Sequence, residues 1–241
     1  MAKGQLYGIG VGPGDPELVT VKAVKYIEKA DIIAFPTAKG ASGNAKRTIE
    51  PYITQSHQLM SLTYPVTAGP VADSETYLPL MKNFYDSTAQ EMKAELLKGK
   101  NIAIICAGDP FIFGSYMYWH ARLVDEFETT VIPGISSILA APVELGKPLC
   151  HREDVVSIIP ATLSEDELVE NLTKSTSAVI MKLGRTFPKV ISALRKAGLE
   201  NKAYYVERAT MQNQRILPVL EVDPTNVAYF SVVVIPCQTP E

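Results

Sequence analysis

Short apolar runs alternate with segments of helical spacing through the first 148 residues. Runs of four to seven apolar residues bounded by Gly and Pro favour buried strands, whereas apolar residues three or four apart favour helices. The sequence predicts strands at residues 5–11, 32–35, 58–62, 101–106 and 129–132, and helices at residues 17–29, 42–52, 74–98, 115–126 and 136–145. Regular alternation of this kind is typical of an α/β unit with a largely parallel sheet.

A second pattern follows the stretch 148–154, where the composition changes and a linker is expected. Strands are predicted at residues 155–159, 177–183, 203–207, 214–220 and 229–235, and helices at residues 165–173 and 187–197. Three late strands with few helices indicate a mixed sheet. We therefore expect two α/β domains, residues 1–148 and residues 149–241, and a cleft between such halves is the usual place for a ligand.

Composition narrows the choice of function. The chain has 241 residues, of which 46% are hydrophobic, and its net charge is −3. That charge argues against binding nucleic acid through its phosphates. The absence of a long apolar run and of a signal-like start predicts a cytoplasmic protein with no membrane span. Cys106, Cys150 and Cys237 are scattered without a paired-cysteine motif, so neither a disulfide framework nor a protein-bound metal is expected.

The first glycine-rich segment, residues 8–15, fails the dinucleotide fingerprint. That fingerprint needs glycines at positions 1, 3 and 6, and the sixth position is Pro13 or Asp15 here. Pro13 also removes a backbone donor, and Asp15 adds negative charge where a pyrophosphate would lie. The segment suits an uncharged or cationic ligand. A plain tight turn capped by Asp15 is the competing interpretation.

Two further Gly/Pro bends, residues 107–115 and 132–137, also follow predicted strands. In a parallel sheet all three bends share the carboxyl edge, where ligands bind. Asp109 could accept hydrogen bonds from ligand hydroxyls, although an Asx-turn ahead of Pro110 would explain the same residue.

Together these segments resemble the tetrapyrrole (corrin/porphyrin) methylase family. Residues 11–20, 108–115 and 133–137 with Ala140 and Ala141 resemble its first three motifs, and residues 206–208 and 229–235 resemble its late segments. Residues 30–36, 108–118 and 179–185 are most similar to the precorrin-2 and cobalt-precorrin-2 C20-methyltransferases. The resemblance implies a class III methyltransferase fold, with two α/β domains and S-adenosylmethionine (SAM) in the cleft between them. It also implies a homodimer.

The resemblance also implies site residues. The expected cofactor contacts are Pro13, Ala107, Gly108, Asp109, Ile112, Phe113, Ser136, Ser137, Met181, Ala209, Tyr229, Phe230 and Ser231. Ala107 and Ala209 replace glycines of the family pattern, and the pair Ser136–Ser137 replaces a Thr-Ala pair.

The implied reaction is methyl transfer from SAM to C20 of precorrin-2 or cobalt-precorrin-2 in cobalamin (vitamin B12) and porphyrin biosynthesis. Such an in-line displacement needs alignment of the reacting atoms more than a base, and His57, His120 and His151 are isolated in sequence. No catalytic residue is therefore assigned. The polycarboxylate substrate is expected to meet cations, with Asp15 as a further contact. The candidates are Lys39, Lys46, Arg47, Arg152, Arg185 and Arg208.

Three alternatives remain open at this stage. The first is another methyltransferase of the same superfamily, acting on a different ring carbon or on diphthine. The second is a nicotinamide-dependent oxidoreductase, which the failed glycine spacing disfavours. The third is a binding module without chemistry.

Overall fold

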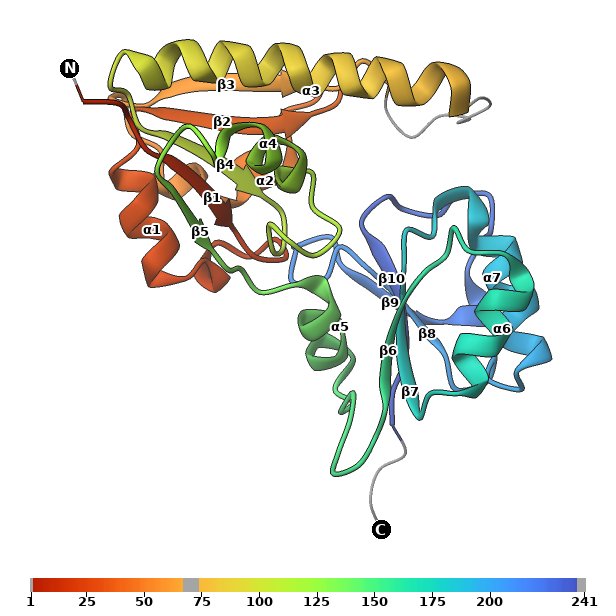
Figure 1. The fold of residues 1–241 in the computed structure, drawn as a ribbon. Coiled ribbons are helices and arrows are strands. Elements are labelled where there is room, and N and C mark those ends of the chain that lie inside the picture. Colours follow the sequence, from red (N-terminus) through yellow and green to blue (C-terminus); the bar gives the residue numbers. More distant parts are fainter. Residues whose placement is uncertain (1, 67–73, 238–241) are drawn as a thin grey trace. The chain divides into compact units, whose positions relative to one another are not determined.

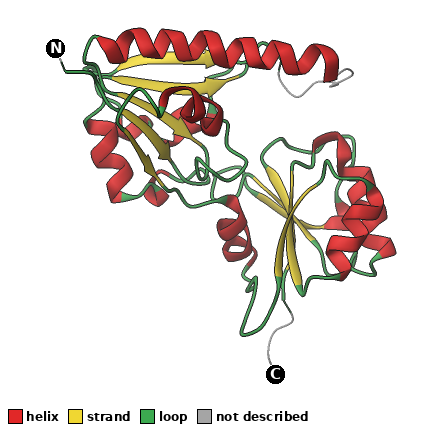
Figure 2. Cartoon of the chain, in the orientation of Figure 1, coloured by secondary structure: helices red, strands yellow, loops and turns green. Residues whose placement is uncertain are grey.

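The computed structural model describes residues 2–66 and 74–237. The chain divides into two compact units, Met1–Ser136 and Ser137–Glu241. Each unit has its own sheet with helices packed on it (Figures 1 and 2). The expected fold class of two α/β domains is confirmed.

The first unit contains a five-stranded sheet in the order β3-β2-β4-β1-β5. All of its strand pairs are parallel, as the alternation of strands and helices predicts. Every residue of the central strands β1 and β4 is buried, because helices cover both faces. The strands are β1 (Leu6–Gly10), β2 (Ile32–Thr37), β3 (Gln58–Thr63), β4 (Ile102–Cys106) and β5 (Thr129–Ile132).

Helices cover this sheet in two layers, each with its own core. Along β4, Ile102 and Ile104 pack under one layer, and Ala103 and Ile105 pack under the other. This alternation follows from the two-residue period of a strand. The first layer contains α3 (Ser74–Leu97) and α4 (Tyr116–Leu123), and the second contains α1 (Val21–Glu28) and α2 (Asn44–Thr48).

Two predicted helices each divide into an α-helix and a 3₁₀ turn. The helix predicted at residues 17–29 is a 3₁₀ turn, Pro16–Leu18, followed by α1, because Thr20 stops the first turn and accepts a hydrogen bond from the amide of Ala23. The helix predicted at residues 42–52 ends at Thr48, and the 3₁₀ turn Glu50–Tyr52 follows. Pro51 has no N–H to continue the α-helical ladder.

The second unit contains a mixed sheet, as predicted, in the order β6-β7-β10-β8-β9. Strands β6 and β7 are parallel, and β10 runs antiparallel to both β7 and β8. The strands are β6 (Val156–Pro160), β7 (Ser177–Met181), β8 (Tyr204–Glu207), β9 (Arg215–Pro218) and β10 (Ser231–Ile235). Helices α6 (Glu165–Thr173) and α7 (Phe187–Lys196) cover one face.

Helix α5 (Ser137–Leu145) covers the other face of this second sheet. Ile138 and Ala141 are buried in one cluster with Val179, Val206 and Val234 from β7, β8 and β10. The division between the units therefore falls before α5, between Ser136 and Ser137, whereas the sequence places it after residue 148. The prediction rested on the change in composition near residue 148. The boundary between the units lies before α5 because α5 buries its apolar face against the second sheet.

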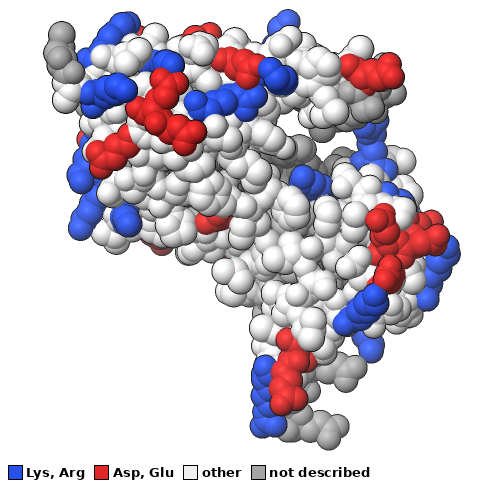
Figure 3. All heavy atoms as spheres, in the orientation of Figure 1, with Lys and Arg blue, Asp and Glu red and all other residues white. Residues whose placement is uncertain are grey.

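No helix in the described ranges is both long enough and apolar enough to cross a membrane. On the face drawn in Figure 3, Lys and Arg side chains lie among Asp and Glu side chains instead of forming one broad positive patch. This distribution agrees with the net charge of −3.

Candidate functional site

The three Gly/Pro bends of the first unit meet at the carboxyl edge of its sheet. Gly12 and Gly108 form an antiparallel bridge, in which the amide of Gly108 donates to the carbonyl of Gly12 at 2.8 Å. The amide of Val11 donates to the carbonyl of Cys106 at 2.9 Å. Backbone bonds therefore hold the first bend directly against the second.

The third bend packs against both others through glycine. A Cβ atom on Gly134 would lie 2.2 Å from the carbonyl oxygen of Gly108, and one on Gly10 would lie 2.5 Å from the amide nitrogen of Gly134. Neither position tolerates a side chain without moving backbone. The expectation that the bends form one rim is confirmed for the described residues of the first unit.

Asp109 joins two of these bends with its carboxylate. Oδ1 accepts from the amide of Phe111 at 2.9 Å, which is the Asx-turn expected before Pro110, and Oδ2 accepts from the amide of Gly134 at 3.2 Å. An ionised carboxylate offers about four acceptor sites. These two bonds therefore leave acceptor capacity at the rim for a ligand hydroxyl.

The rim presents apolar side chains beside this carboxylate. Ala107 is exposed, and so are Ile112 and Phe113, with 39% and 42% of their surface accessible. Phe113 has φ = 51°, which is strained for a residue with a side chain. Strain of this kind persists where the surroundings fix the backbone, as binding sites often do. Pro13 and Ser136 are buried within the bends.

Asp15 lies in the first bend, and its Oδ1 accepts from the amide of Glu17 at 2.8 Å. It therefore caps the 3₁₀ turn, as the competing interpretation of this bend predicts.

A buried cysteine and tyrosine lie just beneath the rim. Burial raises the pKa of Cys106 to about 12, and the nearby Asp109 carboxylate adds to the effect. Burial also raises the pKa of Tyr116, whose ring lies against Gly8. Both groups stay protonated near neutral pH, so Cys106 is a core residue and not a thiolate nucleophile.

The three histidines each have a local partner, as expected for structural residues. His120 Nδ1 lies 3.2 Å from the hydroxyl of Tyr116, and the ring packs against Phe111. His57 contacts Thr54 and the carbonyl of Ile27. The remaining one, His151, pairs with Asp154 at 2.6 Å.

In the second unit, the predicted cofactor residues collect at one edge of the sheet. Because β10 is antiparallel to β7 and β8, its first residue lies beside their carboxyl ends. Met181 therefore shares this edge with Ala209 and Ser231, and the amide of Arg208 donates to the carbonyl of Phe230 at 2.8 Å. Tyr229, at the same edge, is 78% exposed. Ser137 is the first residue of α5, and its neighbour Ile138 is buried in one cluster with Ala209.

The Lys and Arg residues predicted to bind the substrate lie in both units. In the first unit, Lys39 and Arg47 are exposed, and Lys46 lies 5.6 Å from the ring centroid of Phe35. Arg185 is exposed in the 3₁₀ turn Gly184–Thr186, just after β7.

The other two arginines are less suited to the predicted role. Arg208 pairs with the buried carboxylate of Glu207. Arg152 precedes β6, so it lies at the opposite edge of the second sheet from Met181. Arg152 therefore does not join the other predicted site residues of its unit.

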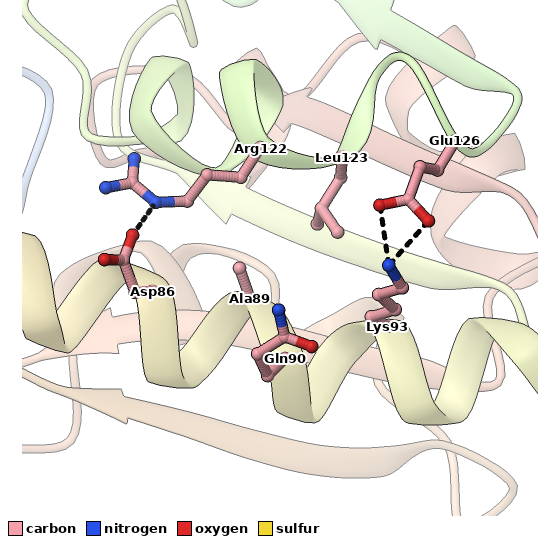
Figure 4. A pocket seen from close by; sticks show the side chains of 7 residues that line it. All are labelled: Asp86, Ala89, Gln90, Lys93, Arg122, Leu123 and Glu126. Atoms are coloured by element: carbon pink, nitrogen blue, oxygen red, sulfur yellow. Dashed lines mark hydrogen bonds and ion pairs between the residues drawn. The ribbon is translucent and has the colours of Figure 1, made fainter.

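A separate pocket of about 150 Å³ opens between α3 and α4 (Figure 4). Its charged side chains pair with one another: Arg122 with Asp86 at 2.7 Å, and Lys93 with Glu126 at 2.6 Å. Each cation thus already has a carboxylate partner, and the pocket lies outside the rim.

A cluster that the sequence analysis missed lies at the edge of the second sheet where Arg152 is found. His151, Asp154 and Cys237 place one metal-binding atom each within 4.8 Å of one another. The pair His151–Asp154 shows only a three-residue spacing, and Cys237 lies far along the chain, so no local motif announces the group.

Comparison with known proteins decides the family. The family model of the tetrapyrrole (corrin/porphyrin) methylases matches residues 5–222. The chain belongs to this family. The family match counts against the nicotinamide-dependent alternative.

Among its relatives, the precorrin-2 C(20)-methyltransferase of a Sinorhizobium species is 40% identical, and the match covers 97% of this chain and 95% of that protein. The cobalamin biosynthesis protein CobIJ of Mycobacterium tuberculosis is 39% identical over 98% of this chain, which spans 46% of that protein's length. The chain thus spans about half the length of its mycobacterial relatives.

The fold is also that of a solved relative. The uroporphyrin-III C-methyltransferase of Thermus thermophilus, solved with S-adenosylhomocysteine, superimposes with a TM-score of 0.67 at 19% identity, covering 97% of both chains.

Proposed function

We propose that this protein transfers a methyl group from SAM to C20 of precorrin-2 or cobalt-precorrin-2 in cobalamin biosynthesis. The observation that carries the proposal is the 40% identity, over nearly the whole of both chains, to an enzyme named for this reaction. Residues 30–36, 108–118 and 179–185, which resemble the C20-methyltransferases, support the same choice of ring carbon.

The residues of the rim fit SAM. Two closely packed glycines hold the three bends together at one edge of the sheet, and Asp109 retains acceptor capacity for ribose hydroxyls. Ala107, Ile112 and Phe113 offer apolar contacts to the uncharged parts of the cofactor. From the second unit, Met181, Ala209, Tyr229, Phe230 and Ser231 are the proposed further contacts, and Pro13, Gly108, Ser136 and Ser137 complete the set. When bound, SAM supplies an electrophilic methyl group on a sulfonium.

The contribution of the chain itself is positioning. The bends are braced by backbone bonds and by Asp109, so their donors and acceptors are fixed before a ligand arrives. Holding two reactants in line can lower a barrier by about 7–11 kcal/mol without any proton transfer. None of the three histidines is needed as a base in this scheme.

The substrate carboxylates are proposed to meet Lys39, Lys46, Arg47, Arg185 and Arg208. Arg185 is the strongest of these, because it is exposed in the turn that follows β7, four residues after Met181. Arg208 would have to share its guanidinium with Glu207. Asp15 is kept as a minor contact, since its carboxylate already caps a turn.

The experiment that tests the function is incubation with SAM and precorrin-2, then with its cobalt form, followed by mass and NMR analysis. Addition of one methyl group at C20 is the expected result. A methyl group at another carbon would contradict the C20 assignment, and no methylation of either substrate would contradict the proposed substrate class. Calorimetric titration with S-adenosylhomocysteine and NAD(P) provides the cofactor control, and only the former is expected to bind.

We also propose that the protein is a cytoplasmic homodimer, as the family resemblance implies. Sedimentation or light scattering would measure twice the monomer mass of 26.3 kDa. A mass of one chain at micromolar concentration would contradict the dimer.

A further inference from the structure

Three side chains that could bind a metal converge at one edge of the second sheet. His151 Nδ1 lies 2.6 Å from Asp154 Oδ2. A ring nitrogen of His151, a carboxylate oxygen of Asp154 and the Sγ of Cys237 all lie within 4.8 Å of one another. The edge is the one at which β6 begins and β10 ends, opposite the edge that carries Met181 and Ser231. The cluster is therefore separate from the proposed cofactor residues.

The backbone holds these three side chains in place. The amide of Asp154 donates to the carbonyl of His151 at 3.0 Å, and the amide of His151 donates to Asp154 Oδ2 at 2.8 Å. Cys237 is fixed from the other side, since its amide and its thiol each donate to the carbonyl of Pro148 at 3.3 Å. The turn at residues 151–154 and the segment after β10 thus bring three potential metal ligands together.

We propose that His151, Asp154 and Cys237 bind a divalent cation of the zinc class. A thiolate, an imidazole and a carboxylate are ligands that Zn²⁺ and Co²⁺ accept and that Mg²⁺ and Ca²⁺ do not favour together. Bond lengths of about 2.0–2.3 Å put tetrahedral ligand atoms about 3.3–3.7 Å apart. The pair His151–Asp154 has to separate by only about 1 Å to reach that spacing.

The accessibility of the cluster also suits a cation. An open pocket of about 340 Å³ is lined by residues 151–154. The thiol of Cys237 is buried, whereas the side chain of His151 is 36% exposed. Binding replaces the thiol proton, which passes to solvent as the sulfur–metal bond forms. Water can complete the coordination, because the three protein ligands leave a fourth position open.

The site would act as a clamp. Bonds from one cation to His151, Asp154 and Cys237 would join the segment after α5 to the end of β10. A ligand that binds only the folded chain raises its stability. The proposal therefore predicts that Zn²⁺ raises the melting temperature and that Mg²⁺ does not.

The first experiment uses Co²⁺ as a spectroscopic probe on the full chain. Cys150 is exposed and adjacent to His151, so Cys150→Ser is introduced first to remove its thiol. This variant is expected to show the thiolate-to-cobalt charge-transfer band with one Co²⁺ per chain. Adding Cys237→Ser should abolish the band, and a band that survives Cys237→Ser would overturn the proposal.

The second experiment measures Zn²⁺ affinity by competition with a chromophoric chelator. Loss of a second-shell partner weakens metal binding about 10- to 100-fold, so loss of a direct ligand in His151→Ala or Asp154→Asn is expected to weaken it at least about 100-fold. Glu153→Gln is the matched control, because it removes an exposed carboxylate from the same turn.

Circular dichroism before metal addition checks that each variant is folded. If a variant does not fold, the Zn²⁺-dependent rise in melting temperature of the Cys150→Ser protein is the remaining test. No rise with Zn²⁺, or equal losses of affinity in Glu153→Gln and Asp154→Asn, would refute the site. The methylation assay is independent of both results, so failure here and failure of the proposed function can be told apart.

Discussion

Asp109 shows how much one side chain contributes at the residue scale, because it serves the fold and the proposed ligand together. Asp109→Ala is expected to weaken binding of S-adenosylhomocysteine by about 1.5–3 kcal/mol, the range for a hydrogen bond to a charged group. Asp109→Ala also removes the hydrogen bond from the amide of Gly134, which holds the third bend in place, and this contributes to the loss of affinity. Isothermal titration calorimetry measures it directly.

The control for this variant is Asp223→Ala. Asp223 also forms an Asx-turn, with the amide of Thr225 at 2.9 Å, but it lies in the second unit and is not one of the predicted site residues. Its removal should leave the affinity unchanged. A folded Asp109→Ala protein with wild-type affinity would contradict the role of Asp109.

Cys106 gives a pH prediction, because burial raises its pKa to about 12 from an ordinary value of 9.0. Between those values the folded state keeps the thiol proton and the unfolded state loses it, so stability falls as pH rises above about 9. The expected loss attributable to Cys106 is about 1 kcal/mol between pH 9 and pH 10. Urea unfolding of the wild type and of Cys106→Ala at pH 8, 9 and 10 measures it.

The cavity left by Cys106→Ala lowers the free energy of unfolding at every pH. The informative quantity is therefore how the difference in free energy of unfolding between the wild type and Cys106→Ala changes with pH. This difference should become smaller as pH rises. Cys150→Ala, which removes an exposed thiol, is measured beside it as the control. A constant difference for Cys106→Ala would contradict the prediction.

At the scale of single elements, α6 shows how a helix start is stabilised by its own side chains. Ser164 Oγ accepts from the amide of Glu167, and Glu167 Oε2 accepts from the amide of Ser164 at 2.9 Å, which is a full capping box. Ser164→Ala should lower the free energy of unfolding by about 1 kcal/mol. Thr162→Ala, at an exposed position just before the cap, is the matched control in the same denaturation experiment. Equal effects of the two substitutions would argue against the box.

The elements themselves could be predicted where the local pattern is strong. The strands of both sheets follow from short apolar runs, and α3 from its long helical spacing. The interruptions after Leu18 and Thr48 could not be predicted, because the spacing of apolar residues continues across them. Capping by Thr20 causes the first interruption, and the missing N–H of Pro51 causes the second.

The site was predictable in kind but not in its contacts. The three bends could be expected at one edge, since parallel strands end together. The bonds from Gly108 to Gly12 and from Gly134 to Asp109 join residues far apart in sequence. No local pattern encodes such pairs, and the same is true of Cys237 beside His151.

At the scale of the whole molecule, each unit has a core of its own. Two clusters lie under the two helical layers of the first sheet, and two others lie on the faces of the second. Each predicted half of the cofactor site therefore rests on a separately packed scaffold. The linker-like composition of residues 148–154 concealed this arrangement, because α5 joins the second core ahead of it.

The boundary can be tested with fragments of the chain. Residues 137–241 retain α5, whereas residues 149–241 lose Ile138 and Ala141 from the cluster that covers Val179, Val206 and Val234. Burial of a single Ile side chain contributes about 1.5–3 kcal/mol, so the shorter fragment should be at least about 2 kcal/mol less stable or unfolded. Thermal melts followed by circular dichroism compare the two fragments. For the first unit, the fragments 1–136 and 1–148 should have the same melting temperature, since α5 adds nothing to that core. If residues 149–241 are as stable as 137–241, the division lies after α5, where the change in composition first indicated it.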